Sequence, residues 1–171
     1  MKHITLITTG GTIEKTYDEQ TGSLDNRRSI VRRMLRRIRL EGTQVNIIEL
    51  MSKDSLHMND TDRARIVAAV RVAIECVPPP TGVVILHGTD TLNLTGDLLA
   101  KELPNASVPI VLTGAMRPYE MTRSDALQNL TESLFAAGML GSGVYCVAHG
   151  RALAFPGVVK DRDHGTFVKV N

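Results

Sequence analysis

The stretch Val83-Val-Ile-Leu-His-Gly-Thr-Asp-Thr-Leu92 decides how this chain folds. Its first four residues are apolar, as expected of a strand in a parallel sheet that is covered on both faces. The residues from His87 to Thr91 carry hydroxyls, one carboxylate and a glycine, and apolar residues at helical spacing follow from 92 to 103. An α/β protein repeats this strand-to-helix unit and places its chemistry where such strands end.

The same unit recurs along the chain. Apolar runs predict strands at 4–7, 45–50, 83–86, 108–112 and 144–147. Helical spacing covers 29–40 and 92–103, a further helix runs from a cap at Asn59 or Asp60 to a stop at Pro78, and another begins near Ser124. Strands that alternate with helices imply right-handed crossovers. We therefore expect an α/β fold of the flavodoxin/Rossmann-like kind, a mainly parallel sheet flanked by helices on both faces.

Two segments depart from this alternation. Residues 16–26 are polar and contain Gly22, which predicts a long mobile loop. Near the C-terminus, β-prone pieces at 152–155 and 166–170 are separated by Pro156-Gly157 and by the charged run 160–164. These pieces predict a short C-terminal β-hairpin or ribbon. With 171 residues the chain fits a single domain, 1–171.

The composition disfavours several classes of function. The chain has 20 Lys and Arg against 18 Asp and Glu, a net charge of +2 that gives little attraction to nucleic acid or anionic lipid. No apolar run approaches membrane-spanning length, and the N-terminus lacks the apolar stretch of a signal peptide, so we expect a cytoplasmic protein with no membrane partner. Cys76 and Cys146 lie in apolar runs without metal-type spacing, which predicts buried free thiols and neither a disulfide framework nor a zinc site.

Arginine is concentrated just after the polar segment. The residues are Arg27, Arg28, Arg32, Arg33, Arg36, Arg37 and Arg39. They fall on the polar side of the helix predicted at 29–40, and such a charged face is more often solvated than bound to nucleic acid. No aromatic residue interleaves with them, which also disfavours the stacking of single-stranded bases. We therefore expect no nucleic-acid partner.

Two strand ends carry hydroxyls that could act as nucleophiles. Thr12 follows two glycines after the first strand, where exposed N–H groups could hold an oxyanion while the hydroxyl attacks. Thr89 and Asp90 follow the strand at 83–86, where the carboxylate could accept a substrate ammonium. The alternatives are an ordinary glycine turn before Thr12 and a helix cap at Thr89 or Asp90.

A threonine hydroxyl attacks well only when a base takes its proton. Tyr17 in the polar segment and Lys160 near the C-terminus are the candidate bases, and spacing alone identifies neither, because each could be an ordinary surface residue. A phosphate-binding loop is disfavoured because its Lys-Ser/Thr ending is absent. We expect His87 to be structural rather than catalytic.

Three motifs together resemble those of the bacterial-type L-asparaginase family. They are Thr9-Gly-Gly-Thr-Ile13, Leu86-His-Gly-Thr-Asp-Thr91 and Leu112-Thr-Gly-Ala-Met-Arg-Pro118, in this order along the chain. Asp54-Ser55, followed by Met58-Asn-Asp60, resembles the family's substrate-binding segment, and Val158-Val-Lys160 resembles the stretch that carries its catalytic lysine. The resemblance covers nearly the whole chain.

The resemblance implies an L-asparaginase (EC 3.5.1.1) that hydrolyses L-asparagine to L-aspartate and ammonia through a β-aspartyl ester. Thr12 would form the ester, and Tyr17 would activate the Thr12 hydroxyl. Thr89 and Lys160 would assist proton transfer, and Asp90 would hold the α-amino group of the substrate. Which of the two threonines attacks first stays open.

The resemblance also implies a substrate-binding set, which comprises Gly11, Asp54, Ser55, Gly88 and Ala115. Ser55 would hold the α-carboxylate, and the Ala115 carbonyl would face the departing amide nitrogen. The backbone N–H groups of Thr12 and Thr89 would form the oxyanion hole. The family needs neither a metal nor a cofactor.

The chain departs from the family pattern in two places. Leu56 stands where family members often have a glutamine, and it cannot hydrogen-bond an ammonium. The chain also ends where the family's N-terminal domain ends, so we expect the small C-terminal domain, which reaches into a neighbouring subunit's site with a carboxylate, to be absent. Fewer groups then hold the substrate, which predicts a high KM and low glutaminase activity. The resemblance implies a homo-oligomer, a dimer or a tetramer, with interfaces that differ from the family's.

Two other functions stay open. The chain could be the amidase component that supplies ammonia to a tRNA-dependent amidotransferase, for which the arginine cluster is the only hint in the sequence. It could also be a catalytically silent domain that senses asparagine. The presence of all five catalytic candidates disfavours the second alternative, because a sensor would not need them.

Overall fold

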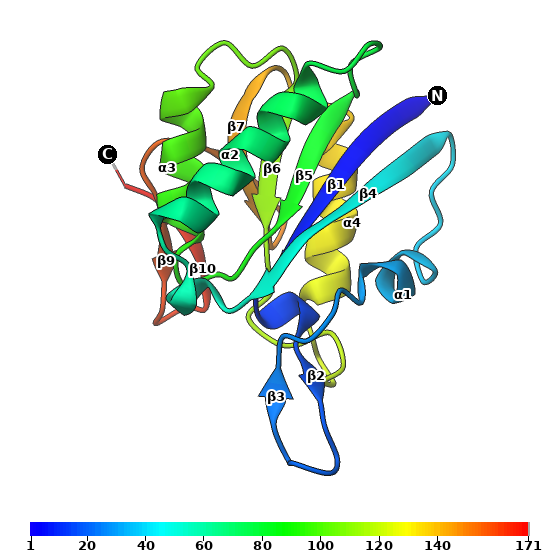
Figure 1. Cartoon of the computed structure of the whole chain (residues 1–171), viewed down its shortest axis with the longest axis vertical. Coiled ribbons are helices and arrows are strands. Elements are labelled where there is room, and N and C mark those ends of the chain that lie inside the picture. The colour runs from blue at the N-terminus through cyan, green and yellow to red at the C-terminus, as the bar shows by residue number, and fades with distance from the viewer. Residues whose placement is uncertain (171) are drawn as a thin grey trace.

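The computed structural model describes residues 1–170, and a six-stranded sheet in the order β4-β1-β5-β6-β7-β8 lies at its centre (Figure 1). The strands are β1 (Lys2–Gly10), β4 (Thr43–Lys53), β5 (Gly82–Leu86), β6 (Pro109–Thr113), β7 (Gly143–Ala148) and β8 (Arg151–Ala154). All neighbours pair in parallel except β8, which is antiparallel to β7. The strand order reverses between β1 and β5, and open α/β sheets bind ligands beyond the carboxyl ends of the strands at such a point.

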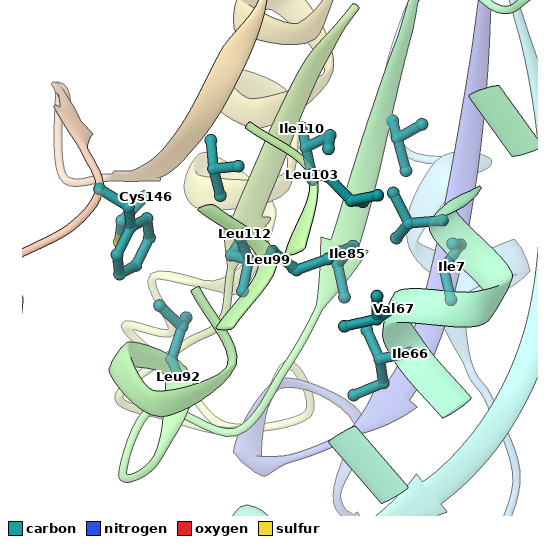
Figure 2. Close-up of a cluster of buried hydrophobic side chains, with 14 of the residues drawn as sticks. Ile7, Ile66, Val67, Ile85, Leu92, Leu99, Leu103, Ile110, Leu112 and Cys146 are labelled. Atoms are coloured by element: carbon teal, nitrogen blue, oxygen red, sulfur yellow. The ribbon is translucent and has the colours of Figure 1, made fainter. Parts of the chain in front are cut away.

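Helices cover both faces of this sheet, which confirms the predicted fold class. They are α1 (Val31–Leu35), α2 (Asp60–Ile74), α3 (Leu92–Glu102) and α4 (Ala126–Ala137), with short 3-10 helices η1 (Thr12–Glu14) and η2 (Ser55–His57). In β5, Val83 and Ile85 pack with α2 and α3, whereas Val84 and Leu86 pack with α1 and α4. The two faces of the sheet thus carry two hydrophobic cores. Figure 2 shows the core that contains Val83 and Ile85, between the strands and helices α2 and α3. Because β5 contributes to both cores, its sequence is continuously apolar.

Helix α2 begins as its sequence predicts. The Asn59 side chain accepts a hydrogen bond from the Asp62 N–H group at 3.0 Å, and the Asp62 carboxylate accepts one from the Asn59 N–H group at 3.2 Å. This reciprocal pair is a capping box, which satisfies two of the free N–H groups at the helix start. The helix ends at Ile74, so it stops before the prolines that were expected to end it.

The helix predicted at 29–40 is wrong in length, because α1 ends at Leu35. Its first residue follows Ile30, which has no side-chain acceptor to cap the helix. Arginines at 32 and 36, and again at 33 and 37, would repel each other across one helical turn. Ile38 still packs against the core, so tertiary packing accounts for the apolar spacing that helix formation does not. The seven arginines are exposed, as expected of a solvated face.

The polar segment 16–26 contains a hairpin where a long loop was predicted. Strands β2 (Thr16–Tyr17) and β3 (Leu24–Asp25) pair antiparallel and project beyond the end of the main sheet (Figure 1). Their turn closes through the N–H group of Gly22, which donates to the Asp18 carbonyl at 2.7 Å. Gly22 has a φ of +68°, a backbone conformation that glycine adopts without strain.

The C-terminal hairpin is confirmed, although one of the two segments that form it differs from the prediction. Strands β9 (Val158–Asp161) and β10 (Thr166–Lys169) pair antiparallel, with Lys160 opposite Phe167. The piece predicted at 152–155 instead forms β8 at the edge of the main sheet. Val158 and Phe167 are buried in the core beside α3, and these contacts attach the hairpin to the body of the protein.

The two cysteines differ in their surroundings. Cys146 in β7 is buried as predicted, and burial raises the pKa of its thiol to about 12. Cys76 is exposed, so the prediction of a buried thiol is wrong there. The apolar run that contains it extends past the end of α2 into solvent, where Val77 is also exposed.

Candidate active site

Two glycine-containing loops touch where the strand order reverses. Gly11 follows β1 and Gly88 lies just beyond β5, and a Cβ atom on Gly11 would come within 2.4 Å of the Gly88 Cα. Gly11 also has a φ of +81°, so this position requires glycine for both its backbone conformation and its close contact. Thr12 and Thr89 each follow one of these glycines. The two strand ends singled out in the sequence therefore meet at the carboxyl end of the sheet.

Lys160 joins Thr89 and Asp90 in one polar cluster. Its Nζ atom donates to Thr89 Oγ1 at 2.8 Å and to Asp90 Oδ1 at 2.9 Å. The C-terminal hairpin brings this lysine to the end of β5, although 71 residues separate it from Thr89. An ammonium at this distance stabilises negative charge on the hydroxyl oxygen, and a neutral amine at the same place could accept the hydroxyl proton.

Asp90 carries a second cation. Arg162 donates to the same Oδ1 atom at 2.9 Å, and nothing in the sequence distinguished this arginine from the rest of the charged run 160–164. Partial burial favours the neutral acid, but the hydrogen bond and charge of Lys160, followed by the charge of Arg162, hold the pKa of Asp90 below its ordinary value. Asp90 is therefore a carboxylate at neutral pH, and within residues 1–170 its Oδ2 atom accepts no hydrogen bond.

Thr12 and Tyr17 lie on neighbouring segments but are not in contact through their hydroxyls. Thr12 begins η1 and is half-buried, and Tyr17 lies on the projecting β2–β3 hairpin with 59% of its surface exposed. The Tyr17 N–H group donates to the Glu120 carboxylate at 2.9 Å. Across the part of the chain that the structure describes, neither hydroxyl makes a hydrogen bond. Tyr17 would have to move to reach Thr12.

Ser55 presents a free hydroxyl beside the glycine contact. It is only 1% exposed, and its Oγ atom has no hydrogen-bond partner among residues 1–170. A Cβ atom on Gly88 would lie 2.5 Å from this oxygen. The hydroxyl of Thr91 holds the Ser55 carbonyl at 2.9 Å and so fixes the start of η2. Buried polar groups normally have a partner, and a ligand group could supply one here.

Asp54 and Leu56 flank Ser55, but within residues 1–170 neither side chain makes a hydrogen bond to this cluster. Asp54 accepts hydrogen bonds from Lys15 Nζ at 2.7 Å and from the Leu56 N–H group at 3.0 Å. The hydrogen bond from Lys15 lowers the pKa of Asp54, despite partial burial. Asp54 lines a separate hollow with Lys15 and Asn26, and no other predicted site residue lines that hollow. The Leu56 side chain is exposed.

Ala115 lies in the loop that follows β6. It is buried, and Gly114 before it is packed so closely that a Cβ atom there would lie 3.1 Å from Thr89 Cγ2. The Gly114 carbonyl accepts a hydrogen bond from Asn129 Nδ2 at 2.9 Å. The N–H group of Met116 donates to the Asp125 carboxylate at 2.9 Å. This loop is therefore held from both sides against Thr89.

His87 and Glu14 are buried ionisable residues next to the site. Burial lowers the pKa of His87 to about 4, and its ring bonds the Gly88 carbonyl and the Thr95 hydroxyl, both at 2.8 Å, so it is a neutral structural group. Glu14 accepts hydrogen bonds from the Gly10 N–H group and the Ser29 hydroxyl, but burial still raises the pKa of its carboxyl. No sequence motif marked Glu14, which ties the Thr12 loop to the segment before α1.

The chemical groups at the site are hydroxyls, a carboxylate, two cations and backbone amides. Within residues 1–170, no group of three or more His, Cys, Asp or Glu residues could hold a metal ion. No helix in this range is long and apolar enough to cross a membrane.

Comparison with known proteins places the chain among asparaginase-related sequences. A family model described as "Asparaginase, N-terminal" matches residues 3–165. A glutamyl-tRNA(Gln) amidotransferase subunit from Methanococcus maripaludis strain C7 is 30% identical over 156 residues, which cover 88% of this chain and 35% of that protein. L-asparaginase of Thermococcus kodakarensis is 35% identical over 107 residues, which cover 63% of this chain and 32% of that protein.

Solved structures share the fold. The thermostable L-asparaginase from Thermococcus kodakarensis has a TM-score of 0.89 at 28% identity and matches 99% of this chain. L-asparaginase I from Vibrio cholerae has a TM-score of 0.81 at 23% identity, which shows likeness of fold alone. This chain spans 51% and 52% of those two structures, and about a third of the length of the curated relatives.

Proposed function

The chain belongs to the asparaginase family, and from that premise we propose that it hydrolyses the side-chain amide of L-asparagine to L-aspartate and ammonia. The observation that carries the proposal is the cluster in which Lys160 bonds both Thr89 and Asp90, opposite the loop of Thr12. A hydroxyl, an amine and a carboxylate in this arrangement suit acyl transfer from an amide. Glutamine, which is longer by one methylene, should be the poorer substrate.

In the proposed mechanism Thr12 is the nucleophile. Its oxygen bonds to the amide carbon, the oxyanion accepts hydrogen bonds from the Thr12 and Thr89 N–H groups, and the C–N bond then breaks. The hydroxyl proton passes to the nitrogen, which leaves as ammonia. Water next attacks the β-aspartyl ester, and Thr12 regains its proton as aspartate departs. The choice of Thr12 is supported by its free hydroxyl, since Thr89 Oγ1 already accepts a hydrogen bond from Lys160.

Three groups would hold the substrate. The free Oδ2 atom of Asp90 would accept the α-ammonium, and the unpartnered Ser55 hydroxyl would donate to the α-carboxylate. The Ala115 carbonyl would accept a hydrogen bond from the amide nitrogen. Tyr17 would activate Thr12 after the β2–β3 hairpin moves toward the sheet, because in the present conformation its side chain is largely exposed.

Ammonia release from L-asparagine and from L-glutamine tests this proposal. Thr12→Ala and Thr89→Val should each lower kcat for asparagine by about a thousandfold or more, because residues that act as one catalytic unit fail together. Thr131→Val is the control, since its hydroxyl bonds only the Leu127 carbonyl on the exposed side of α4. Full activity in Thr12→Ala would contradict the mechanism. Asparagine binding without ammonia release from the wild type would indicate a sensing domain instead.

A second candidate function has one specific observation in its favour. Several relatives at about 30% identity are named as a subunit of glutamyl-tRNA(Gln) amidotransferase. As an amidase component of such an enzyme, the chain would supply ammonia to a partner, and the exposed arginines of residues 27–39 would lie near tRNA. This function predicts tRNA binding that weakens steeply with salt. The absence of a gel shift at low salt would exclude it.

A further inference from the structure

Asp125 holds the loop that contains Ala115. Asp125 precedes α4, but its side chain does not cap that helix. The Ser124 hydroxyl instead accepts a hydrogen bond from the Ala126 N–H group at 3.1 Å. The Asp125 carboxylate turns back and accepts the Met116 N–H group at 2.9 and 3.0 Å and the Arg117 N–H group at 3.0 Å. Aspartate at this position usually accepts an N–H group of its own helix. Asp125 therefore stabilises the loop that contains Ala115 and not the start of α4.

The Ala115 carbonyl and the Met116 N–H group belong to one peptide group. In a trans peptide the two point in opposite directions and lie in one plane. An acceptor that fixes the N–H group therefore also fixes the direction of the Ala115 carbonyl. A charged acceptor makes the stronger hydrogen bond, and such bonds polarise the peptide and increase the electron density on the carbonyl oxygen.

His149 connects this loop to the hairpin of Lys160. Its Nε2 atom donates to Asp125 Oδ2 at 2.7 Å, and its Nδ1 atom pairs with Thr166 Oγ1 at 2.9 Å. Thr166 lies in β10 opposite Asp161, the residue after Lys160. His149 has a φ of +52°, uncommon for a residue other than glycine, and its backbone N–H group is held by Asn129 Oδ1 at 3.1 Å.

The carboxylate is ionised in this network. Partial burial alone would raise the pKa of Asp125, but the Met116 N–H group and the His149 ring outweigh it and hold the pKa below its ordinary value. Asn129 Nδ2 also donates to Asp125 at 3.0 Å and to the Gly114 carbonyl at 2.9 Å. The two peptides that flank Ala115 are therefore fixed by a single connected set of side chains.

We propose that Asp125 and His149 are positioning residues that aim the Ala115 carbonyl at the nitrogen of the scissile amide. The inference rests on the proposed function, because the amide comes from it. An amide nitrogen carries N–H groups that this carbonyl can accept, whereas the leaving oxygen of an ester carries none. The network should therefore assist the cleavage of amides much more than the cleavage of esters.

The test compares kcat/KM for L-asparagine and for the β-methyl ester of L-aspartate, two substrates that share an acyl group. Asp125→Ala should lower the value for asparagine by about tenfold or more, and the value for the ester by less than about threefold. His149→Asn should act in the same direction by a smaller factor. An asparagine side chain at position 149 tolerates the positive φ of this residue, but it removes the bridge from His149 to Thr166. If Asp125→Ala does not fold, His149→Asn supplies the same comparison.

Asp62→Ala is the matched control, because Asp62 is also a carboxylate that accepts a backbone N–H group beside a helix and pairs with a neighbouring cation. It should change both substrates by the same factor. Equal losses for the two substrates in Asp125→Ala and His149→Asn, or no loss in either, would overturn the proposal. A wild type that cleaves neither substrate would instead contradict the proposed function on which this inference rests.

Discussion

At the scale of single residues, Asp90 has the most demanding role in the proposed site. Two cations share its Oδ1 atom, and its Oδ2 atom is left for a substrate ammonium. Asp90→Asn should raise KM for L-asparagine by about thirtyfold, since the loss of a partly buried ionic partner costs about 2 kcal/mol. Steady-state ammonia release measures this change, with Glu75→Gln at the exposed C-terminal end of α2 as control. An unchanged KM would mean that the ammonium binds elsewhere.

Glu14 gives a prediction about pH and stability. Burial raises its pKa above the ordinary 4.5, so the folded protein holds this proton more tightly than the unfolded chain does. Between the ordinary and the raised pKa, stability therefore falls as pH rises. Relative to Glu14→Gln, the wild type should lose free energy of unfolding between pH 4.5 and neutrality. Denaturant titrations at several pH values measure the difference, and a constant difference would rule out this explanation.

The sequence marked some of these residues and not others, for a physical reason. Thr12, Thr89 and Asp90 lie directly after strands, where chemistry is expected, and the family motifs supplied Lys160. Contacts that join distant segments leave no local pattern. Arg162 reaches Asp90 only because β9 and β10 form a hairpin, and the network of Asp125 and His149 joins α4 to β10.

At the scale of elements, a close contact between α3 and the segment before β9 carries the Lys160 hairpin. A Cβ atom on Gly96 would lie 2.1 Å from the ring of Phe155, and this ring is buried. Gly96→Ala should therefore push the ring out and destabilise the fold by about 1–3 kcal/mol. The unfolding temperature and kcat/KM should both fall, because the hairpin that places Lys160 in the site begins just after Phe155.

Gly141→Ala is the matched control for that substitution, since nothing lies within 4 Å of a Cβ atom at Gly141. It should leave the unfolding temperature and kcat/KM close to those of the wild type. If Gly96→Ala were as stable and active as Gly141→Ala, the packing of Phe155 would not position the hairpin.

The elements themselves were predictable to different degrees. Helix α2 and strand β5 carry local signals, a capping box and a continuous apolar run, and both lie close to their predicted places. Helix α1 has no capping side chain at Ile30 and has repelling arginines, so apolar spacing alone overestimated its length. The β2–β3 hairpin is too short and polar for its pattern to indicate strands.

At the scale of the whole molecule, charge is nearly balanced but unevenly distributed. The net charge is +2, yet all seven arginines of residues 27–39 are exposed, and Arg27 pairs with Asp18 in the turn of the β2–β3 hairpin that carries Tyr17. Some are neutralised, because Arg33 pairs with Glu120 at 2.8 Å. We propose that residues 1–171 act as one catalytic domain within a homo-oligomer, whose state sedimentation would measure.

The position of the site follows from the topology. Glycines after β1 and β5 touch where the strand order reverses, and the C-terminal hairpin adds its lysine from the side. This arrangement brings Thr89, Asp90 and Lys160 into contact beside the loop of Thr12. The central claim is that Thr12 uses this arrangement to form an ester with the β-carboxyl of the substrate.

Mass spectrometry of the protein, quenched in acid during turnover of L-asparagine, tests that claim most directly. We predict a mass increase of one aspartyl group on the peptide that contains Thr12, and its absence from Thr12→Ala. An adduct on the peptide of Thr89, or turnover without any adduct on either threonine, would contradict it.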